Sequence, residues 1–272
     1  VVAAGSFCAG FVGSLTGLGG GVIIVPLLTL ALGVDIRYAI GASLVSVIAT
    51  SSGAAAAYVR EGFTNLRIGM FLEIATTVGA LAGAYLATRM PASAIAIVFG
   101  LALLQSAWFA ATKKDDDDRA VSSEPDGLAR RLQLSGEYPG PDGPIRYAAR
   151  RVPAGFGLMG LAGVLSGLLG IGSGAVKVIA MDQAMGLPFK VSTTTSNFMI
   201  GVTAAASAGI YLGRGYIDPG LAMPVMLGVL AGSFAGARVL TAAKNRTLRL
   251  VFSVVVAVIA IQMIYKGISG NL

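Results

Sequence analysis

Long apolar runs separated by short polar breaks fill most of the chain, and this pattern predicts membrane helices. Each run reaches the length that crosses a bilayer, about 20 residues. The breaks fall at polar and proline positions such as Arg60-Glu61-Gly62 and Asp218-Pro219. We predict ordinary spans at 37–59, 67–88 and 91–111, and again at 190–212, 219–241 and 247–265.

Two longer runs, 3–33 and 154–186, are each split by a cluster of glycines. As a single helix, residues 3–33 would measure roughly 46 Å, whereas the hydrocarbon core of a bilayer is about 30 Å thick. Two structures fit this length. One is a long, tilted, broken helix, and the other is a re-entrant hairpin whose two half-helices meet inside the membrane.

The second part of the chain repeats the first. Gly17 aligns with Gly170, 153 positions later, and GSLTGLGGG (13–21) then lies on SGLLGIGSG (166–174) without a gap. The same offset pairs Ser43 with Ser196, Thr50 with Thr203, Tyr58 with Tyr211 and Thr88 with Thr241. Shared Ala and Gly content explains some matches but not those of Tyr, Ser and Thr. We therefore predict two homologous halves, 1–111 and 153–272, joined by a linker at 112–152.

The linker is rich in charge, Pro, Gly and Ser, and it contains no apolar run of bilayer length. Residues 113–151 hold 8 of the 20 basic and 8 of the 13 acidic residues, so this segment is neutral. We expect a solvent-exposed cytoplasmic loop with one short surface helix near 127–134. The Asp115–Asp118 run lacks the spacing of a calcium loop.

The composition supports a membrane protein. The chain is 55% hydrophobic and only 12% charged, with a mean hydropathy of +0.79, whereas a soluble domain carries about 25% charged residues. We therefore predict an all-α polytopic membrane protein. The net charge of +7 belongs to its membrane part, which fits an anionic substrate, anionic lipid or the positive-inside bias equally.

Basic residues favour the hairpin form by a small margin when the linker is placed in the cytoplasm. With hairpins, each half crosses three times, the halves are inverted, and six of the remaining basic residues lie inside against four outside. With full spans the halves are parallel and the count is four against six. The residues counted are Arg37, Arg60, Arg67, Arg89, Lys190, Arg214, Lys244, Arg246, Arg249 and Lys266. Inverted repeats with broken helices are also a common transporter plan.

The glycine breaks are the first candidates for chemistry. Half-helices that begin near Gly21 and Gly174 would present N–H groups and positive dipole ends to an anion, and glycine lets the backbone approach it. The candidate residues are Gly17, Gly19, Gly20 and Gly21 in the first break, and Gly170, Gly172, Ser173 and Gly174 in the second. Close helix packing is the alternative. It better explains Gly79-xxx-Gly83 and Gly228-xxx-Gly232-xxx-Gly236, whose small-residue faces suit a homodimer or packing within one chain.

Lys177 follows the second break inside an apolar stretch, and its partner in the repeat is Ile24. A charge at membrane depth is costly and usually functional. Lys177 is therefore a candidate for substrate binding or gating. The alternatives are a pair with Asp182, at a poor helical spacing, or a side chain that reaches the membrane surface.

Polar side chains in two further segments complete the candidate site. The first turns of the 190–212 span offer Thr194, Thr195, Ser196 and Asn197, and Ser43 corresponds in the first half. These groups suit an oxyanion, although helix capping and bonding back to the helix explain them equally. Glu73 is a lone acid in an apolar span, six residues after Arg67. It is a candidate for proton coupling, or it lies at the membrane surface beside Arg67.

The residue inventory excludes common enzyme sites. The chain has no histidine and one cysteine, Cys8, so a Ser-His-Asp triad and the usual zinc sites are excluded. Gly170, Gly172 and Ala175 fit a loose GxGxxA, but no soluble strand precedes them. We expect no enzymatic activity, no cofactor, no metal and no nucleic-acid partner. The partners expected are a small anion and the lipid bilayer.

The sequence resembles the TauE/SafE family of membrane permeases, often called sulfite exporters. The resemblance rests on GSLTGLGGGVIIVPLL (13–28) and SGLLGIGSGAVKVIA (166–180), and on GASLVSVIATS (41–51) and TTTSNFMIG (193–201). It implies secondary transport of sulfite, an organosulfonate or a related sulfur oxyanion across a bacterial inner membrane. The second break departs from the first, because it reads GSG for GGG and has Ile179 where the first half has Pro26. This departure makes Lys177 a candidate selectivity residue.

Two other functional classes remain open from the sequence. One is an anion channel, or a carrier for another solute such as a carboxylate. The other is a membrane scaffold without transport activity, against which the deep glycine breaks and Lys177 both argue.

Overall fold

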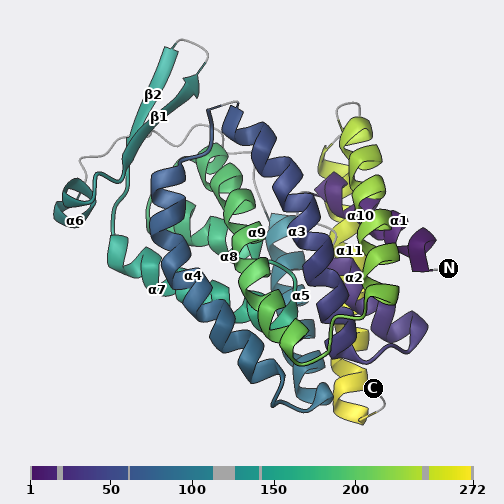
Figure 1. Ribbon diagram of the computed structural model, residues 1–272. Helices are drawn as coiled ribbons and strands as arrows, with labels where there is room; N and C mark the ends of the chain where they lie inside the picture. The colour runs from purple at the N-terminus through teal and green to yellow at the C-terminus, as the bar shows by residue number, and fades with distance from the viewer. Residues whose placement is uncertain are drawn as a thin grey trace.

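The computed structural model describes residues 2–16, 21–60, 62–112, 126–140, 143–240 and 245–270, and these are mostly helical (Figure 1). The helices of the first half are α1 Val2–Thr16, α2 Gly21–Pro26, η1 Leu27–Ala31, α3 Ile36–Arg60, α4 Leu66–Ala87 and α5 Ala92–Thr112. Those of the second half are α7 Val152–Leu169, α8 Gly174–Ile179, η2 Ala180–Ala184, α9 Phe189–Gly213, α10 Pro219–Leu240 and α11 Asn245–Ser269. The six ordinary spans predicted from the sequence are therefore confirmed as helices.

Three helices are long and apolar enough to cross a membrane within the described residues, namely Leu66–Ala87, Val152–Leu169 and Pro219–Gly236. Shorter apolar helical stretches lie at Val2–Gly13, Gly21–Ala31, Ala92–Trp108 and Ser253–Ser269. The helix α4 shows how such a helix meets lipid. It buries Leu72 and Thr76 inside the protein but leaves Ile74 and Val78 59% and 65% exposed. An exposed apolar stripe of this kind suits a hydrocarbon surround.

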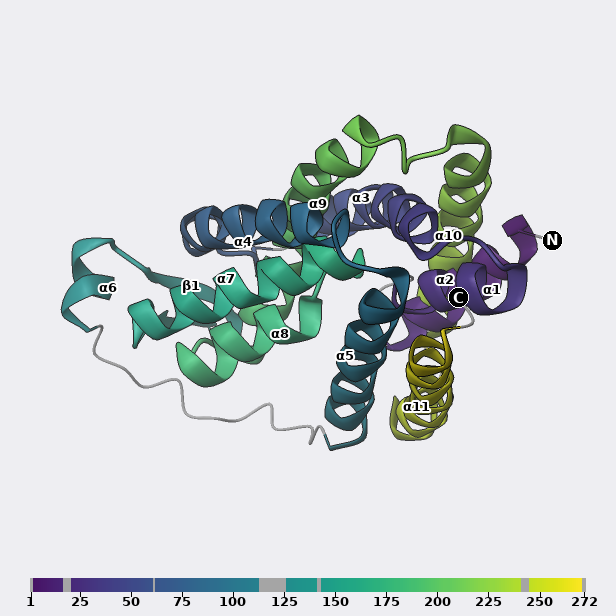
Figure 2. The ribbon, with the colours of Figure 1, turned by 90° about the horizontal axis from the view of Figure 1, so that it is seen from below.

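The helices pack across the two halves. Helix α1 packs on α10, and α4 packs on α7. Under the 153-residue offset α1 corresponds to α7 and α10 to α4, so these two pairs are equivalent. Helix α3 packs on α9, and α5 lies beside α11 (Figure 2). Under the same offset α3 corresponds to α9 and α5 to α11, so each of these two pairs joins a helix to its own counterpart.

Glycines allow the closest of these contacts. A Cβ on Gly79 would collide with the carbonyl oxygen of Gly160, and a Cβ on Gly83 with that of Val164. Gly228 and Gly232 of α10 lie against the α1 backbone in the same way. The expected helix-contact role of these glycines is confirmed, and it is met within one chain.

The linker departs from the all-α expectation. The short helix α6 Gly127–Arg131 forms where it was expected, but an antiparallel hairpin of β1 Ser135–Gly140 and β2 Gly143–Ala148 follows it. The expected plain loop is therefore wrong for 135–140 and 143–148. Pro139 pairs with Pro144 across the ladder. Proline is tolerated there because each strand of a two-stranded sheet is an edge strand.

The hairpin docks on the loop between α3 and α4. Asn65 donates from Nδ2 to the Tyr147 hydroxyl at 2.8 Å, and Arg67 donates to Gln133 Oε1 at 2.6 Å. Tyr147 is buried in this position. Asn65 also caps α4, because its Oδ1 accepts the Ile68 N–H at 3.0 Å.

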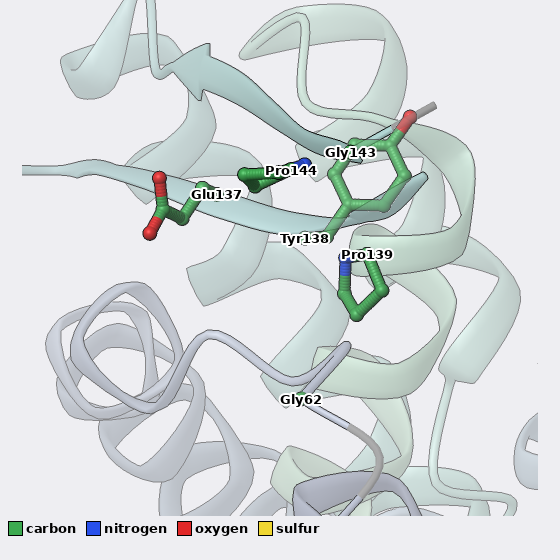
Figure 3. Close-up of a pocket in the computed structure, with 6 residues that line it drawn as sticks. All are labelled: Gly62, Glu137, Tyr138, Pro139, Gly143 and Pro144. Atoms are coloured by element: carbon green, nitrogen blue, oxygen red, sulfur yellow. The ribbon is translucent and has the colours of Figure 1, made fainter. Parts of the chain in front are cut away.

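An open surface pocket lies where the hairpin meets this loop. Figure 3 shows Tyr138 and Pro139 of β1 above Gly62, with Glu137 directed away from it. Its lining residues are Gly62, Glu137, Tyr138, Pro139, Gly143 and Pro144. None of the site residues predicted from the sequence lines this pocket.

Candidate functional site

The second glycine break lies against the packed pair α3 and α9. Ser43 of α3 donates from Oγ to the Gly170 carbonyl at 2.8 Å. Ser196, its repeat partner on α9, donates to the Gly174 carbonyl at 3.3 Å. A serine at one shared position of the repeat therefore holds the break from both helices.

The first break reaches the same place. A Cβ on Gly21 would lie 3.0 Å from Ser43 Oγ and 3.4 Å from the Gly170 carbonyl oxygen. Gly21, where α2 begins, is therefore next to Gly170, the cap residue that follows α7. The other predicted residues of the first break, Gly17, Gly19 and Gly20, lie outside the described residues.

Left-handed backbone explains the glycines of the second break. Gly170 has φ +66° and Gly172 has φ +73°, a region that glycine enters freely. Space is also limited at both positions. A Cβ on Gly170 would lie 2.7 Å from the Ile40 side chain, and a Cβ on Gly172 would lie 2.8 Å from the Ile200 side chain. Residues 170–173 are all buried.

Ser173 is the exception in this turn. It has φ +44°, a conformation that costs an L-residue roughly 1–2 kcal/mol. It is only 5% exposed, and its hydroxyl finds no hydrogen-bond partner among the described residues. A strained residue with an unpartnered buried hydroxyl at the break is a candidate for ligand contact.

The segment after the second break folds back along α7. The Arg150 N–H, just before α7, donates to the Met185 carbonyl, just after η2, at 2.9 Å. Gly155 near the start of α7 also faces the Met185 side chain. The two ends of the 152–184 segment therefore lie together, with the break at its far end.

Lys177 points from α8 to α9 and α4. It is fully buried, and its Nζ donates to Thr203 Oγ1 at 2.6 Å. Thr203 in turn lies 2.7 Å from Glu73 Oε1, to which Thr77 also donates at 3.1 Å. The structure thus brings together two predicted residues, Lys177 and Glu73, through Thr203, which was not among the predicted site residues.

The contacts bear on one alternative for each of these two charges. Lys177 does not reach the membrane surface, because none of its side chain is exposed. Arg67 does not accompany Glu73, because its guanidinium donates to Gln133 of the linker. The signal that would have found Thr203 is its place seven residues after Ser196, on the same face of α9.

The threonines at the start of α9 have a different setting. Thr194 donates to the Phe63 carbonyl at 3.0 Å, and Thr195 Oγ1 accepts the Asn65 N–H at 3.1 Å. Both hydroxyls hold α9 against the loop that also carries the hairpin. The structure therefore does not bring Thr194 and Thr195 to the breaks. Asn197, the other predicted polar residue of this helix, is half-buried.

An apolar exterior over helices that bury hydroxyls and a Lys–Glu pair defines a multi-pass membrane protein. Residues 2–263 match the family described as Sulfite exporter TauE/SafE, and the chain belongs to that family. The resemblance noted from the glycine motifs is thereby confirmed, and it covers nearly the whole chain.

Curated bacterial relatives carry names of the same kind. The Bacillus subtilis (strain 168) "Probable membrane transporter protein YunE" is 28% identical over 96% of this chain and 95% of its own length. The "Probable membrane transporter protein YdhB" of the same strain is 28% identical over 85% of this chain and 86% of its own. A Sinorhizobium sp "Probable membrane transporter protein ORF9" is 22% identical over 95% and 89%. No solved structure matches the chain.

Proposed function

We propose that this protein is a secondary transporter that moves a small sulfur-containing oxyanion, such as sulfite or an organosulfonate, across the bacterial inner membrane. The observation that carries this proposal is the meeting of the two breaks, where Gly21 lies next to the Gly170 carbonyl beside Ser43. The anion binds there, between the half-helices 21–31 and 174–184. The family description points to sulfite, whereas the relatives' names state only membrane transport.

The chemistry of the breaks suits an anion. The first N–H groups of each half-helix have no partner within their own helix, and they point back toward the break. Ser173 adds a buried hydroxyl without a partner among the described residues. Backbone and hydroxyl donors in a site of low polarity recognise an oxyanion without a metal or cofactor.

Inverted halves with re-entrant hairpins are part of this proposal. The start of α7 lies beside the end of η2, so the 152–184 segment enters and leaves on one side. The linker end of the molecule gathers the contacts of Asn65 with Tyr147 and of Thr194 with Phe63. The opposite end gathers Arg37, which donates to the Met90 carbonyl and lies over the Tyr216 ring. This grouping supports a cytoplasmic linker and the hairpin count of basic residues.

Reconstituted transport tests the proposal. Purified protein in liposomes should give saturable uptake of sulfite, sulfoacetate or ethanesulfonate, and no comparable uptake of acetate. Gly174→Leu should abolish the flux, because the new side chain would enter the space beside Ile200 and Ser196. Gly157→Leu is the matched control, because nothing lies within 4 Å of a Cβ at that position.

Three outcomes would overturn parts of this proposal. Equal fluxes from Gly174→Leu and the unchanged protein would remove the breaks as the site. Currents far above carrier turnover would replace the carrier with a channel. A preference for acetate would replace the sulfur oxyanion with a carboxylate.

A further inference from the structure

Glu73, Thr203 and Lys177 form a hydrogen-bonded chain across three helices, which we call the charge relay. The Lys177 ammonium donates to Thr203 Oγ1 at 2.6 Å, and Thr203 Oγ1 lies 2.7 Å from Glu73 Oε1. The acid comes from α4 in the first half, and the lysine and threonine come from α8 and α9 in the second. No direct Lys177–Glu73 ion pair within 4.0 Å occurs in the described part of the chain, so the hydroxyl mediates the contact.

The repeat supplies an internal comparison for this relay. Under the 153-residue offset, Lys177 corresponds to Ile24 and Glu73 to Met226, whereas Thr203 corresponds to another threonine, Thr50. Ile24 is fully buried, as Lys177 is. The same scaffold is therefore built in the first half without either charge, and packing alone does not require them.

The central hydroxyl has the same local neighbour in both halves, a carbonyl of its own helix. Thr203 Oγ1 lies 2.8 Å from the Met199 carbonyl oxygen, and Thr50 Oγ1 lies 3.0 Å from the Ser46 carbonyl oxygen, four residues earlier in each case. In Thr203 the single hydroxyl proton has a second acceptor within reach, Glu73 Oε1. Only the second-half threonine also meets charged groups. The pair of charges is thus an addition to a complete helix contact, at a depth where burying ions is costly.

Glu73 is the member of the relay that is poised to change its charge. Its Oε1 is held by Thr203 and Thr77, while its Oε2 is buried with no hydrogen-bond partner among the described residues. An ionised carboxylate leaves that oxygen unsatisfied, and a proton on Oε2 would remove the charge. Glu73 therefore has one oxygen held by hydrogen bonds and one oxygen that is available to bind a proton.

Among the described helices packed around Glu73, the cation that reaches it is Lys177, through Thr203. Helix α7, packed on α4, has no ionisable residue in 152–169. Helix α9 has Lys190 near its start and Tyr211 near its end, and the Tyr211 hydroxyl donates to the Gly167 carbonyl. Of the ionisable residues of α8 and η2, Lys177 reaches Glu73 through Thr203, and Asp182 lies five residues further along.

We propose that the charge relay couples transport of the anion to a proton. While Glu73 is ionised, it compensates Lys177 through Thr203. When Glu73 binds a proton on Oε2, Lys177 becomes an uncompensated cation one helical turn from Gly174 and attracts the anion to the breaks. Loss of the proton restores the Glu73–Lys177 pair and releases the anion. One proton thus travels with one negative charge, in the same direction.

This coupling rests on the proposed anion transport, and it is tested with ethanesulfonate, which stays ionised over the pH range used. Liposomes that contain the protein and the pH dye pyranine receive ethanesulfonate outside. The unchanged protein should acidify the lumen as the anion enters. An inward gradient of one pH unit should sustain about tenfold accumulation.

Substitutions in the relay separate the role of the Glu73 carboxyl in coupling from its role in folding. Glu73→Gln mimics the protonated state, so it should retain exchange of ethanesulfonate across the membrane but lose the pyranine signal and the accumulation. The double variant Glu73→Met with Lys177→Ile reproduces the apolar pair of the first half, and it should fold but lose ethanesulfonate uptake. Thr203→Val should weaken the coupling, and Thr50→Val, its repeat partner, should not.

The possible results distinguish a failure of proton coupling from a failure of anion transport itself. Saturable flux that neither acidifies the lumen nor responds to the gradient overturns the coupling alone. A Glu73→Gln variant that still accumulates the anion also overturns it. Absence of saturable flux of every sulfur oxyanion overturns the transport function, and the coupling with it.

Discussion

The Ser43 hydroxyl on α3 donates to the Gly170 carbonyl at 2.8 Å, between residues 127 positions apart in the chain. This bond crosses from the first half to the break in the second. Gly170 follows α7 in a left-handed conformation, and its carbonyl therefore has no hydrogen-bond donor within that helix. Ser43 therefore supplies the bond that the break removes, and it fixes one half against the other.

Removal of that hydroxyl should lower stability. Ser43→Ala leaves a buried carbonyl without its donor, which costs about 1–3 kcal/mol, and it should lower the Tm in detergent. Ser46→Ala is the matched control, because the Ser46 hydroxyl is equally buried but bonds only to Ala42 in its own helix. Equal Tm changes for the two variants would show that the bond between the halves has no special weight.

The glycine face of α4 should tolerate no side chain. Gly79→Ala would place a Cβ against the Gly160 carbonyl of α7, so α4 and α7 must separate and lose contact along their length. We expect a clearly lower Tm and aggregation on gel filtration. Gly157→Ala on the open face of α7 should leave the Tm unchanged or slightly higher, because alanine favours helix over glycine. A stable Gly79→Ala variant would contradict the close contact.

Helix positions were predictable because apolar runs and polar breaks mark the spans, and the repeat fixes them twice. The hairpin at 135–148 was not predictable in this way. Its strands contain glycine and proline and lack an apolar alternation. Tyr147 is buried in a cluster with residues distant in the sequence, such as Ile68, and it accepts a hydrogen bond from Asn65. Its one local signal was the sequence Pro-Asp-Gly at 141–143, a combination that favours turns.

The candidate site was predictable as single residues but not as contacts. Lys177 and Glu73 are conspicuous because charges are rare in apolar spans, but their common partner Thr203 is one hydroxyl among many. Thr194 and Thr195 show the reverse problem. A hydroxyl near a helix start suits a ligand and a neighbouring loop equally, and only the fold reveals that Phe63 and Asn65 take these two.

Tyr147 should make docking of the hairpin depend on pH in strongly alkaline solution. Burial raises the pKa of Tyr147 above its ordinary value of 10.0. The neutral phenol is thus favoured in the docked state. The contribution of Tyr147 to docking is therefore constant below about pH 10 and is lost as the pH rises above it. The absorbance of tyrosinate in the unchanged protein, less that of Tyr147→Phe, isolates this one group. A midpoint at or below 10.0 would contradict its burial.

Replacement of Ser173 by glycine should raise the stability of the protein. The first half has Gly20 at the equivalent position, so glycine suits the repeat. Ser173→Gly relieves a left-handed serine, roughly 1–2 kcal/mol, and removes an unpartnered buried hydroxyl, about 1–3 kcal/mol. The greater freedom of glycine in the unfolded chain opposes this by only about 0.5–1 kcal/mol. The Tm should therefore rise.

The same substitution should reduce anion transport, because the hydroxyl would no longer contact the anion at the break. Ser173→Ala is the matched variant, since it loses the hydroxyl but keeps a Cβ in the left-handed conformation. Both variants should show a higher KM for sulfite or ethanesulfonate in liposomes, whereas the larger rise in Tm should appear only in Ser173→Gly. A Ser173→Gly variant with a higher Tm and an unchanged KM would mean that the strained serine serves no ligand.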